Sequence, residues 1–172
     1  MTGFKILTLN SHHGVGKDGK YNFDLLCDEI AKLECDVICL QEVDAFALRS
    51  RFNNQPKLLA AKLGFNLSKS RVRFFGLGNQ YNVILSRFDF VSSFTANLPR
   101  VSGTQKRKAL LTVINVDGTN VALTNTHLHS HGSKKEANLL AEKQLEYIYK
   151  NTSHDTKHVV AGDFNLLPES VE

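Results

Sequence analysis

The sequence is poor in cysteine and has no long apolar run and no segment rich in proline, glycine or serine. Its three cysteines, Cys27, Cys35 and Cys39, are odd in number and lie in periodic apolar segments, which favours buried free thiols over a disulfide framework or a metal site. No apolar run approaches the length of a membrane span, and Met1 leads into a strand-like segment without a signal-peptide pattern. We expect one domain over residues 1–172, with no membrane span, in a reducing, cytoplasmic compartment.

The composition allows one substantial hydrophobic core. Of the 172 residues, 42% are hydrophobic, and no internal repeat or low-complexity segment divides the chain. Lysine and arginine number 21 against 17 aspartate and glutamate, which gives a net charge of +4 and a pI near 9.0. This charge favours anionic partners slightly, although an ordinary basic surface would have the same composition.

The first third of the chain has the pattern of a strand, a helix and a strand. Residues 4–9 predict a strand that ends at Asn10, and Asn22 can cap a helix whose apolar residues recur at helical spacing up to Leu33. A second strand over 37–40 leads into Glu42, so the unit brings two polar residues to neighbouring strand ends. A second helix is predicted over 55–63, closed by Gly64.

The rest of the chain is richer in strands. Asp117-Gly118 predicts a hairpin turn, and Ser133 with Glu136 forms the pattern of a capping box that opens another helix. The predicted strands cover residues 67–75, 81–86, 91–96, 109–116, 121–126 and 157–161.

Six polar residues stand at the predicted strand ends. Any one of them is an ordinary turn residue, but buried strand ends do not carry this many polar groups unless a ligand satisfies them. We therefore predict one site at which they meet. The residues are Asn10, Glu42, Asn125, His127, Asp163 and Asn165.

Five segments, in order, carry a family resemblance. They are LTLN (7–10), LQEV (40–43), GNQYNVILS (78–86), NTHL (125–128) and GDFN (162–165). Together they resemble the ordered motifs of the endonuclease/exonuclease/phosphatase superfamily. The resemblance implies an α+β or α/β fold of the DNase I-like type, a four-layer sandwich of two mixed sheets packed face to face with helices outside. It also implies hydrolysis of phosphate esters, as in a phosphodiesterase or nuclease, with a divalent metal, usually Mg²⁺, for which Mn²⁺ can substitute.

The resemblance also suggests roles for the strand-end residues. Glu42, helped by Asn10, is expected to hold Mg²⁺, which prefers oxygen ligands and keeps several waters. Asp163 is expected to orient or activate the attacking water, or to bind a metal, and Asn165 to hold a phosphoryl oxygen. His127 is expected to donate to a phosphoryl or leaving oxygen, as a side chain that titrates near neutrality can do.

Asn82, Arg107 and Asn125 are predicted to bind the substrate. For Arg107 the flanking residues Lys106 and Lys108 favour a solvent-facing side chain over a phosphate contact. Further basic residues could line the path of a polyanion such as a nucleic acid, although no aromatic residues interleave with them in the sequence. These are Arg49, Arg51, Lys69, Arg71 and Arg73.

The sequence departs from the family pattern near its carboxyl end. Family members close the site with a later Ser-Asp-His segment, and none follows Asn165, so we expect a chain that is incomplete at this end. Ser153-His154-Asp155 has the wrong order and place, and we expect it not to be catalytic. One alternative is therefore a truncated or inactive module that binds phosphate or nucleic acid without turnover.

A second alternative is a histidine-bound metal site. His127, His129 and His131 alternate, and on an extended strand they would share one face and could bind zinc or manganese. This interpretation leaves Glu42 and Asp163 without a role. Neither the substrate (DNA, RNA, inositol phosphate, lipid or another phosphoester) nor the oligomeric state follows from the sequence.

Overall fold

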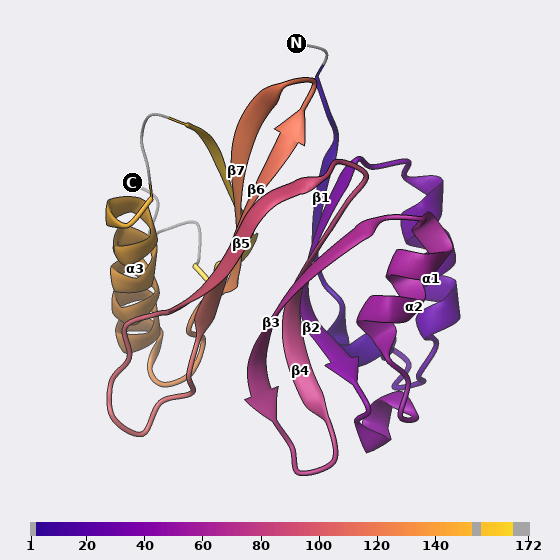
Figure 1. The fold of residues 1–172 in the computed structure, drawn as a ribbon. Helices are drawn as coiled ribbons and strands as arrows, with labels where there is room; N and C mark the ends of the chain where they lie inside the picture. The colour runs from indigo at the N-terminus through magenta and orange to yellow at the C-terminus, as the bar shows by residue number, and fades with distance from the viewer. Residues whose placement is uncertain (1–2, 153–155, 167–172) are drawn as a thin grey trace.

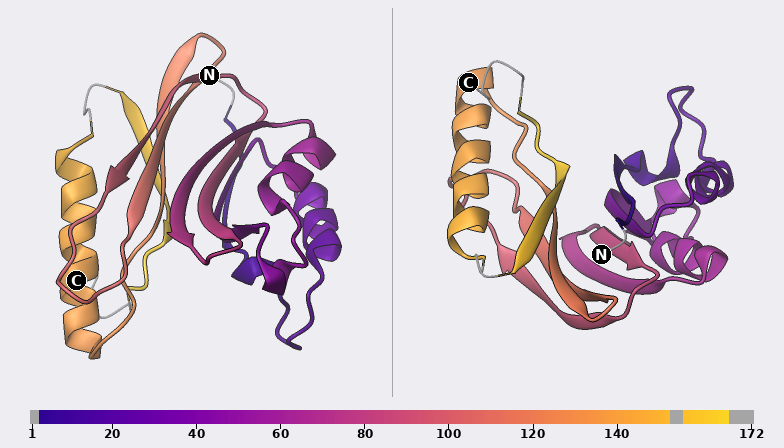
Figure 2. Two further views of the ribbon diagram at one scale, coloured as in Figure 1. Left: turned by 60° about the horizontal axis from the view of Figure 1, so that its bottom comes forward. Right: turned by 90° about the horizontal axis from the view of Figure 1, so that it is seen from above.

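The computed structural model describes residues 3–152 and 156–166, and in it two four-stranded sheets pack face to face with helices outside (Figures 1 and 2). The predicted four-layer sandwich is confirmed. The first sheet has the order β1-β2-β4-β3 and the second the order β5-β6-β7-β8. The strands are β1 (Ile6–Asn10), β2 (Val37–Ala45), β3 (Asn66–Phe74), β4 (Asn79–Ser86), β5 (Phe90–Asn97), β6 (Lys108–Val116), β7 (Thr119–His127) and β8 (Lys157–Asp163).

The helices form the two outer layers. Figure 1 shows α1 and α2 against the first sheet and α3 against the second. The helices are α1 (Phe23–Lys32), α2 (Gln55–Leu63) and α3 (Lys134–Lys150), and two short 3₁₀ turns cover His12–Gly14 and Leu48–Ser50.

The helix ends follow the predicted capping. The Asn22 side chain accepts a hydrogen bond from the backbone N–H of Leu25, and Ser133 and Glu136 form the reciprocal capping box of α3. Gly64 ends α2 in the left-handed conformation, with φ of 68°, which glycine adopts without a steric penalty. The helices therefore begin and end where the sequence indicates.

Each sheet is mixed, and both deliver strand ends to the same edge of the sandwich. β1 pairs parallel with β2, and β7 pairs parallel with β8, while the other pairs are antiparallel. The ends of β1 and β8 meet, as the hydrogen bond of 3.0 Å from Nδ2 of Asn10 to Oδ2 of Asp163 shows. The polar strand-end residues of the two sheets thus share one edge.

The hydrophobic core has three layers, one between each pair of neighbouring layers of the sandwich. Phe23 and Ile30 of α1 pack on the outer face of the first sheet, and Ala141 and Ile148 of α3 pack on the second. Between the sheets lie Val37, Cys39, Ile84, Leu110, Ile114, Val116, Val121, Leu123 and Ala161. Burial of this apolar surface is the main favourable term that holds the sheets together.

One strand differs clearly from its prediction. The sequence places the end of the second strand at Leu40, whereas β2 continues to Ala45 and contains Glu42. The β2–β4 register shifts between Leu40 and Val43, so a bulge interrupts the ladder and the strand resumes beyond it. The apolar pattern fades at this bulge, which is why the strand was predicted too short.

Two composition-based expectations concern the membrane and the thiols. Within the part of the chain that is described, no helix is long and apolar enough to cross a membrane. All three cysteines are free, with Cys27 and Cys39 buried and Cys35 half-buried. Burial raises the pKa of Cys27 to about 11 and that of Cys39 to about 12.

The thiols should therefore differ in reactivity. In native protein at pH 8, we expect Cys35 to react with iodoacetamide well before Cys27 and Cys39, because the two buried thiols are neither accessible nor ionised. Peptide mass spectrometry over a time course would measure each rate, and protein in 6 M guanidinium would serve as the control in which all three react. Alkylation of native Cys39 as fast as Cys35 would contradict the burial of β2.

Candidate active site

Most of the predicted site residues line one pocket at the shared edge of the sheets. The pocket has a volume of about 310 Å³. It contains six of the eight residues predicted to act in the site: Asn10, Glu42, Arg107, His127, Asp163 and Asn165. It also contains residues that the sequence analysis did not assign to the site, among them Phe75, Gln80, Gln105 and Ser130.

Glu42 reaches the pocket because of the bulge in β2. Its backbone has φ of 58°, a left-handed conformation that non-glycine residues rarely adopt. Such strain persists only where the surrounding structure enforces it, and it is frequent at functional sites. The side chain is 21% exposed, and its carboxylate lies 3.1 Å from Nε2 of His13.

Asp163 enters the pocket from the second sheet, at the end of β8. The residue before it, Gly162, has φ of 150°, and a Cβ atom there would lie 2.1 Å from the carbonyl oxygen of Thr126. Only glycine fits so close to β7. Gly162 therefore lets β8 stay paired with β7 up to Asp163, its last residue. Asp163 lies beside both His127 and Asn10.

His127 lies between the two carboxylates. Its Nδ1 is 3.6 Å from Oε1 of Glu42, and its Nε2 is 3.7 Å from Oδ2 of Asp163. Burial lowers the pKa of His127 to about 4, with Arg107 acting in the same direction and the two carboxylates opposing it. This direction is away from the near-neutral titration expected from the sequence, and it favours the neutral imidazole, which presents one donor and one acceptor.

Arg107 is buried, although its sequence context favoured a solvent-facing side chain. It is only 5% exposed, its Nη2 donates to Oγ of Ser130 at 3.3 Å, and its buried Nε has no hydrogen-bond partner among the described residues. Burial lowers the pKa of Arg107, while Glu42 and Asp163 raise it. An unpaired donor of a buried guanidinium is costly, and an anionic ligand would satisfy it.

Asn10 and Asn165 line the pocket with part of their hydrogen-bonding capacity in use. The Oδ1 of Asn10 accepts from the backbone N–H of His12 at 3.0 Å. The Nδ2 of Asn165 donates to the carbonyl oxygen of Leu128 at 3.0 Å. Among the described contacts, Asn10 therefore has a second lone pair on Oδ1 and a second amide hydrogen without a partner, and Asn165 has a second amide hydrogen and its Oδ1.

Asn125 and Asn82 were predicted to bind the substrate, but the structure does not bring them into the pocket with the other predicted residues. Asn125 is fully buried, and its Nδ2 donates to the carbonyl oxygens of Leu40 and Val83 at 2.8 Å each. Asn82 is 1% exposed and donates to the carbonyl oxygen of Lys108 at 3.0 Å. Both amides connect one sheet to the other.

A chain of polar contacts behind Glu42 was missed in the sequence. Asp44 has no exposed side-chain surface, and its carboxylate accepts two hydrogen bonds from Arg49, at 2.7 and 3.0 Å. His13 lies between the two acids, with Nδ1 3.4 Å from Asp44 and Nε2 3.1 Å from Glu42. Alternation in the strand was a usable signal, because Asp44 is two residues from Glu42 and can share its face.

Burial raises the pKa of the Asp44 carboxyl, but its hydrogen bonds from His13 and Arg49 outweigh this effect and hold the pKa below its usual value. The carboxylate is therefore ionised across the neutral range. It fixes His13 against Glu42 and so supports the strained backbone of the bulge.

The alternating histidines do not form a metal site. His127 ends β7, and the chain then turns, so that Nε2 of His129 contacts the carbonyl oxygen of His131 at 2.7 Å. Among the described residues, no three His, Cys, Asp or Glu side chains are grouped closely enough to hold a metal by themselves. The zinc or manganese alternative with these ligands is therefore wrong. Ser153, His154 and Asp155 lie outside the described residues.

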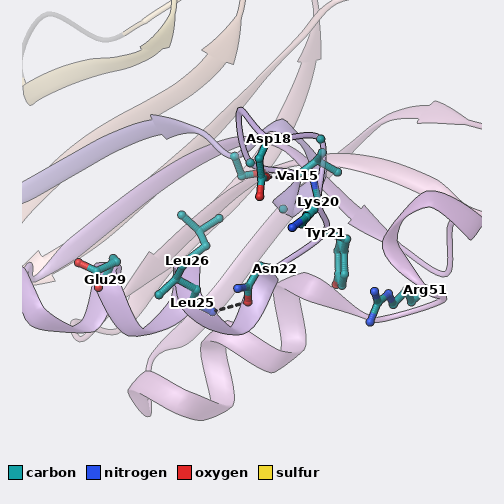
Figure 3. A pocket seen from close by; sticks show the side chains of 13 residues that line it. Val15, Asp18, Lys20, Tyr21, Asn22, Leu25, Leu26, Glu29 and Arg51 are labelled. Atoms are coloured by element: carbon teal, nitrogen blue, oxygen red, sulfur yellow. Dashed lines mark hydrogen bonds between the residues drawn. The ribbon is translucent and has the colours of Figure 1, made fainter.

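A larger pocket lies elsewhere and contains none of the predicted site residues. Its volume is about 680 Å³, and it is formed by the loop over residues 14–21 and the start of α1. Figure 3 shows Leu25, Leu26 and Tyr21 on its walls, with Asp18, Lys20 and Arg51 around them. Most of the surface is apolar, and no cluster of facing titratable groups suggests chemistry there.

Comparison with known proteins identifies the family. The sequence matches the Endonuclease/Exonuclease/phosphatase family over residues 7–172, and the chain belongs to this family. A search of curated proteins found no match.

Solved structures share the fold at low sequence identity. The endonuclease/exonuclease/phosphatase from Beutenbergia cavernae DSM 12333 has a TM-score of 0.77 and 24% identity, over 96% of this chain and 49% of its own. The human Nocturnin catalytic domain with bound sulfate has a TM-score of 0.72 and 18% identity, over 96% of this chain and 65% of its own. A mannosyl-6-phosphatase from Bacteroides thetaiotaomicron VPI-5482 has a TM-score of 0.69 and 16% identity, over 95% of this chain and 66% of its own. The chain thus spans about half to two thirds of these structures.

The position of Asn125 predicts a role in stability. Asn125→Ala would leave two buried carbonyl oxygens and the Gln41 amide without their partner, so we expect a loss of about 3 kcal/mol in the free energy of unfolding. Asn125→Asp should cost more, because a buried carboxylate would face the same carbonyl oxygens. Urea denaturation monitored by circular dichroism would measure both. The exposed Asn120 of the same strand is the control, and Asn120→Ala should change stability by less than about 0.5 kcal/mol.

A second stability prediction concerns Asp44. Asp44→Ala removes the partner of Arg49 and of His13, and we expect a loss of about 2 kcal/mol, reduced by the partial exposure of Arg49. Because the pKa of Asp44 is lowered on folding, the difference from wild type should persist from pH 7 to about pH 4 and shrink below that. The control is Asp28→Ala. Asp28 forms an exposed ion pair with Lys62, so this substitution should shift the urea midpoint little. Equal effects of the two substitutions would argue against the buried network.

Proposed function

We propose that the chain is a divalent-metal-dependent phosphoesterase that hydrolyses phosphodiesters, with a nucleic acid as the favoured class of substrate. One observation carries the proposal. Two carboxylates from different sheets, Glu42 and Asp163, lie against opposite nitrogens of His127, and the guanidinium of Arg107 lines the same pocket. Membership of the family supports a hydrolase of phosphate esters.

The donor atoms of the pocket fit a hard divalent cation. Carboxylate and amide oxygens are the ligands that Mg²⁺ prefers, and this ion usually keeps several waters, so one or two carboxylates suffice. Glu42 would hold the ion, with the free lone pair of Asn10 beside it, and Mn²⁺ could replace Mg²⁺. When bound, the cation would polarise the phosphoryl group and offset charge in the transition state.

The residues around this position can divide the remaining work. Asp163 accepts hydrogen bonds and can orient the attacking water, while neutral His127 can donate to a phosphoryl or leaving oxygen. The unpaired Nε of Arg107 and the free amide hydrogen of Asn165 supply donors for phosphoryl oxygens. His13 and Asp44 act indirectly, because they contact Glu42 and each other.

The free thiols support a reducing compartment, and we propose the cytoplasm as the site of action. The alternative, a module that binds phosphate or nucleic acid without turnover, makes a distinct prediction. It would bind metal and anions through the same pocket but show no metal-dependent hydrolysis.

Metal binding and turnover would test the proposal. Isothermal titration with Mn²⁺ should show binding by the wild type that weakens at least tenfold in Glu42→Gln, because the carboxylate ligand is lost. Asp163→Asn should retain metal binding but lower kcat on bis(p-nitrophenyl) phosphate by about 100-fold or more. Glu142→Gln, an exposed change on α3, is the matched control for charge.

The outcomes separate the two interpretations. Identical metal binding by wild type and Glu42→Gln would exclude Glu42 as the ligand. Metal binding that depends on Glu42, together with no hydrolysis above the EDTA control, would favour the binding module.

A further inference from the structure

A second polar pocket adjoins the candidate active site. It has a volume of about 620 Å³, and its lining comes from the end of β3, the end of β5 and the segment that leads into β6. Four basic residues line it: Arg71, Arg73, Lys106 and Lys108.

The two pockets are continuous. Arg73 and Gln105 line both of them, so a ligand that occupies the active-site pocket can extend into the second one without leaving the protein surface. The combined surface runs from Asp163, at the end of β8, to Arg71 on the edge strand β3.

The described lining of the second pocket is positively charged. No aspartate or glutamate lines it, and among residues 3–152 and 156–166 no carboxylate lies within ion-pair distance of its four basic side chains. By contrast, the active-site pocket next to it holds two carboxylates. Four neighbouring positive charges repel one another, and a ligand with several negative charges relieves this repulsion.

Aromatic rings accompany the basic residues. Phe74 lines the second pocket and is 62% exposed, so its ring is accessible to a ligand there. Phe75 lines the active-site pocket, with the guanidinium of Arg49 4.6 Å and that of Arg73 4.7 Å from its ring centroid. The sequence did not suggest this association, because the two rings follow the basic residues instead of alternating with them.

From these observations we infer that the basic pocket binds the phosphates of a single-stranded nucleic acid whose scissile phosphate lies in the active-site pocket. The inference rests on the proposed function and names its substrate. Positive grooves with exposed aromatic rings bind single strands, because bases freed from a duplex can stack on the rings. Phe74 supplies such a ring, and Arg71, Lys106 and Lys108 supply contacts to phosphates beyond the reacting one.

Binding can be measured without turnover. A fluorescein-labelled 12-mer of oligodeoxythymidylate in EDTA should show an increase in fluorescence anisotropy with wild-type protein. At 50 mM salt, Arg71→Gln with Lys108→Gln should weaken binding at least tenfold. Loss of two phosphate contacts should also reduce the slope of log K against log salt by about 1.4.

A matched double variant controls for net charge. Lys5→Gln with Lys157→Gln removes two exposed lysines at the starts of β1 and β8, away from the strand ends that form the pocket. We expect the affinity of this variant for the 12-mer to stay within twofold of the wild type. Equal weakening in both double variants, or no weakening in the pocket variant, would overturn the inference. Thermal denaturation of each variant checks that it is folded.

The single-stranded character has its own test. Phe74→Ala should weaken binding of the 12-mer about tenfold through lost stacking. A 12-base-pair duplex should bind the wild type more weakly than the strand. Equal or tighter binding of the duplex would overturn the single-strand assignment.

Hydrolysis of a small substrate distinguishes this inference from the proposed function. The pocket variant should hydrolyse bis(p-nitrophenyl) phosphate with Mg²⁺ at the wild-type rate, because that substrate does not reach the basic residues. If the wild type does not hydrolyse it but the pocket variant still loses strand binding, the proposed function fails and the basic pocket stands. If hydrolysis is present and strand binding is unchanged in the pocket variant, the reverse holds.

Discussion

The side-chain amide of Asn125 is the contact on which the site depends most. It projects from β7 of one sheet and donates to the carbonyl oxygens of Leu40 and Val83 in the other, while its oxygen accepts from Gln41 at 2.7 Å. Leu40 and Val83 are register partners directly before the bulge in β2. The amide therefore supplies partners to backbone groups where the ladder becomes irregular, and a bulge in a buried strand needs such partners.

The bulge in turn sets the position of Glu42. Further contacts, made by residues next to it in β2 and by His13, hold the Glu42 side chain in place. Gln41 joins the sheets from within the core, and the buried Asp44 fixes His13 against the Glu42 carboxylate. Asn82 plays the corresponding part for the second sheet, because it holds the carbonyl of Lys108, next to Arg107. Each sheet thus supplies reacting groups to the pocket and polar supports to the other sheet. Relative movement of the sheets would disturb both.

The sequence predicted the helices and strands well because its local signals agreed with one another, whereas the four-layer arrangement followed from the resemblance to the family. The Asn22 cap, the Ser133 capping box and Gly64 mark helix ends by short-range chemistry, and the apolar periodicity marks the strands. It did not separate residues that face the pocket from those that face the other sheet. Asn125 and His127 are two apart on one strand, yet one ties the sheets together and the other faces the two carboxylates. That distinction, like the burial of Arg107, depends on how the second sheet packs, which local patterns do not contain.

The residues proposed to carry the reaction and those proposed to contact the substrate are anchored in different parts of the fold. Glu42, His127 and Asp163 stand on strands whose positions are fixed by buried inter-sheet contacts, so their geometry is determined by the core. The basic pocket, which forms the rim of the site, lies mainly on the edge strand β3 and on the connection before β6, where Phe74 is 62% exposed. Only Lys108, at the start of β6, is held there by an inter-sheet contact of the kind described above, and that contact is to its backbone carbonyl. A change at the rim can therefore alter which polyanion binds without disturbing the carboxylates, whereas a change at Asn125 would alter both. On the proposed function, the strands that carry the carboxylates would fix the chemistry and the rim would select the polyanion.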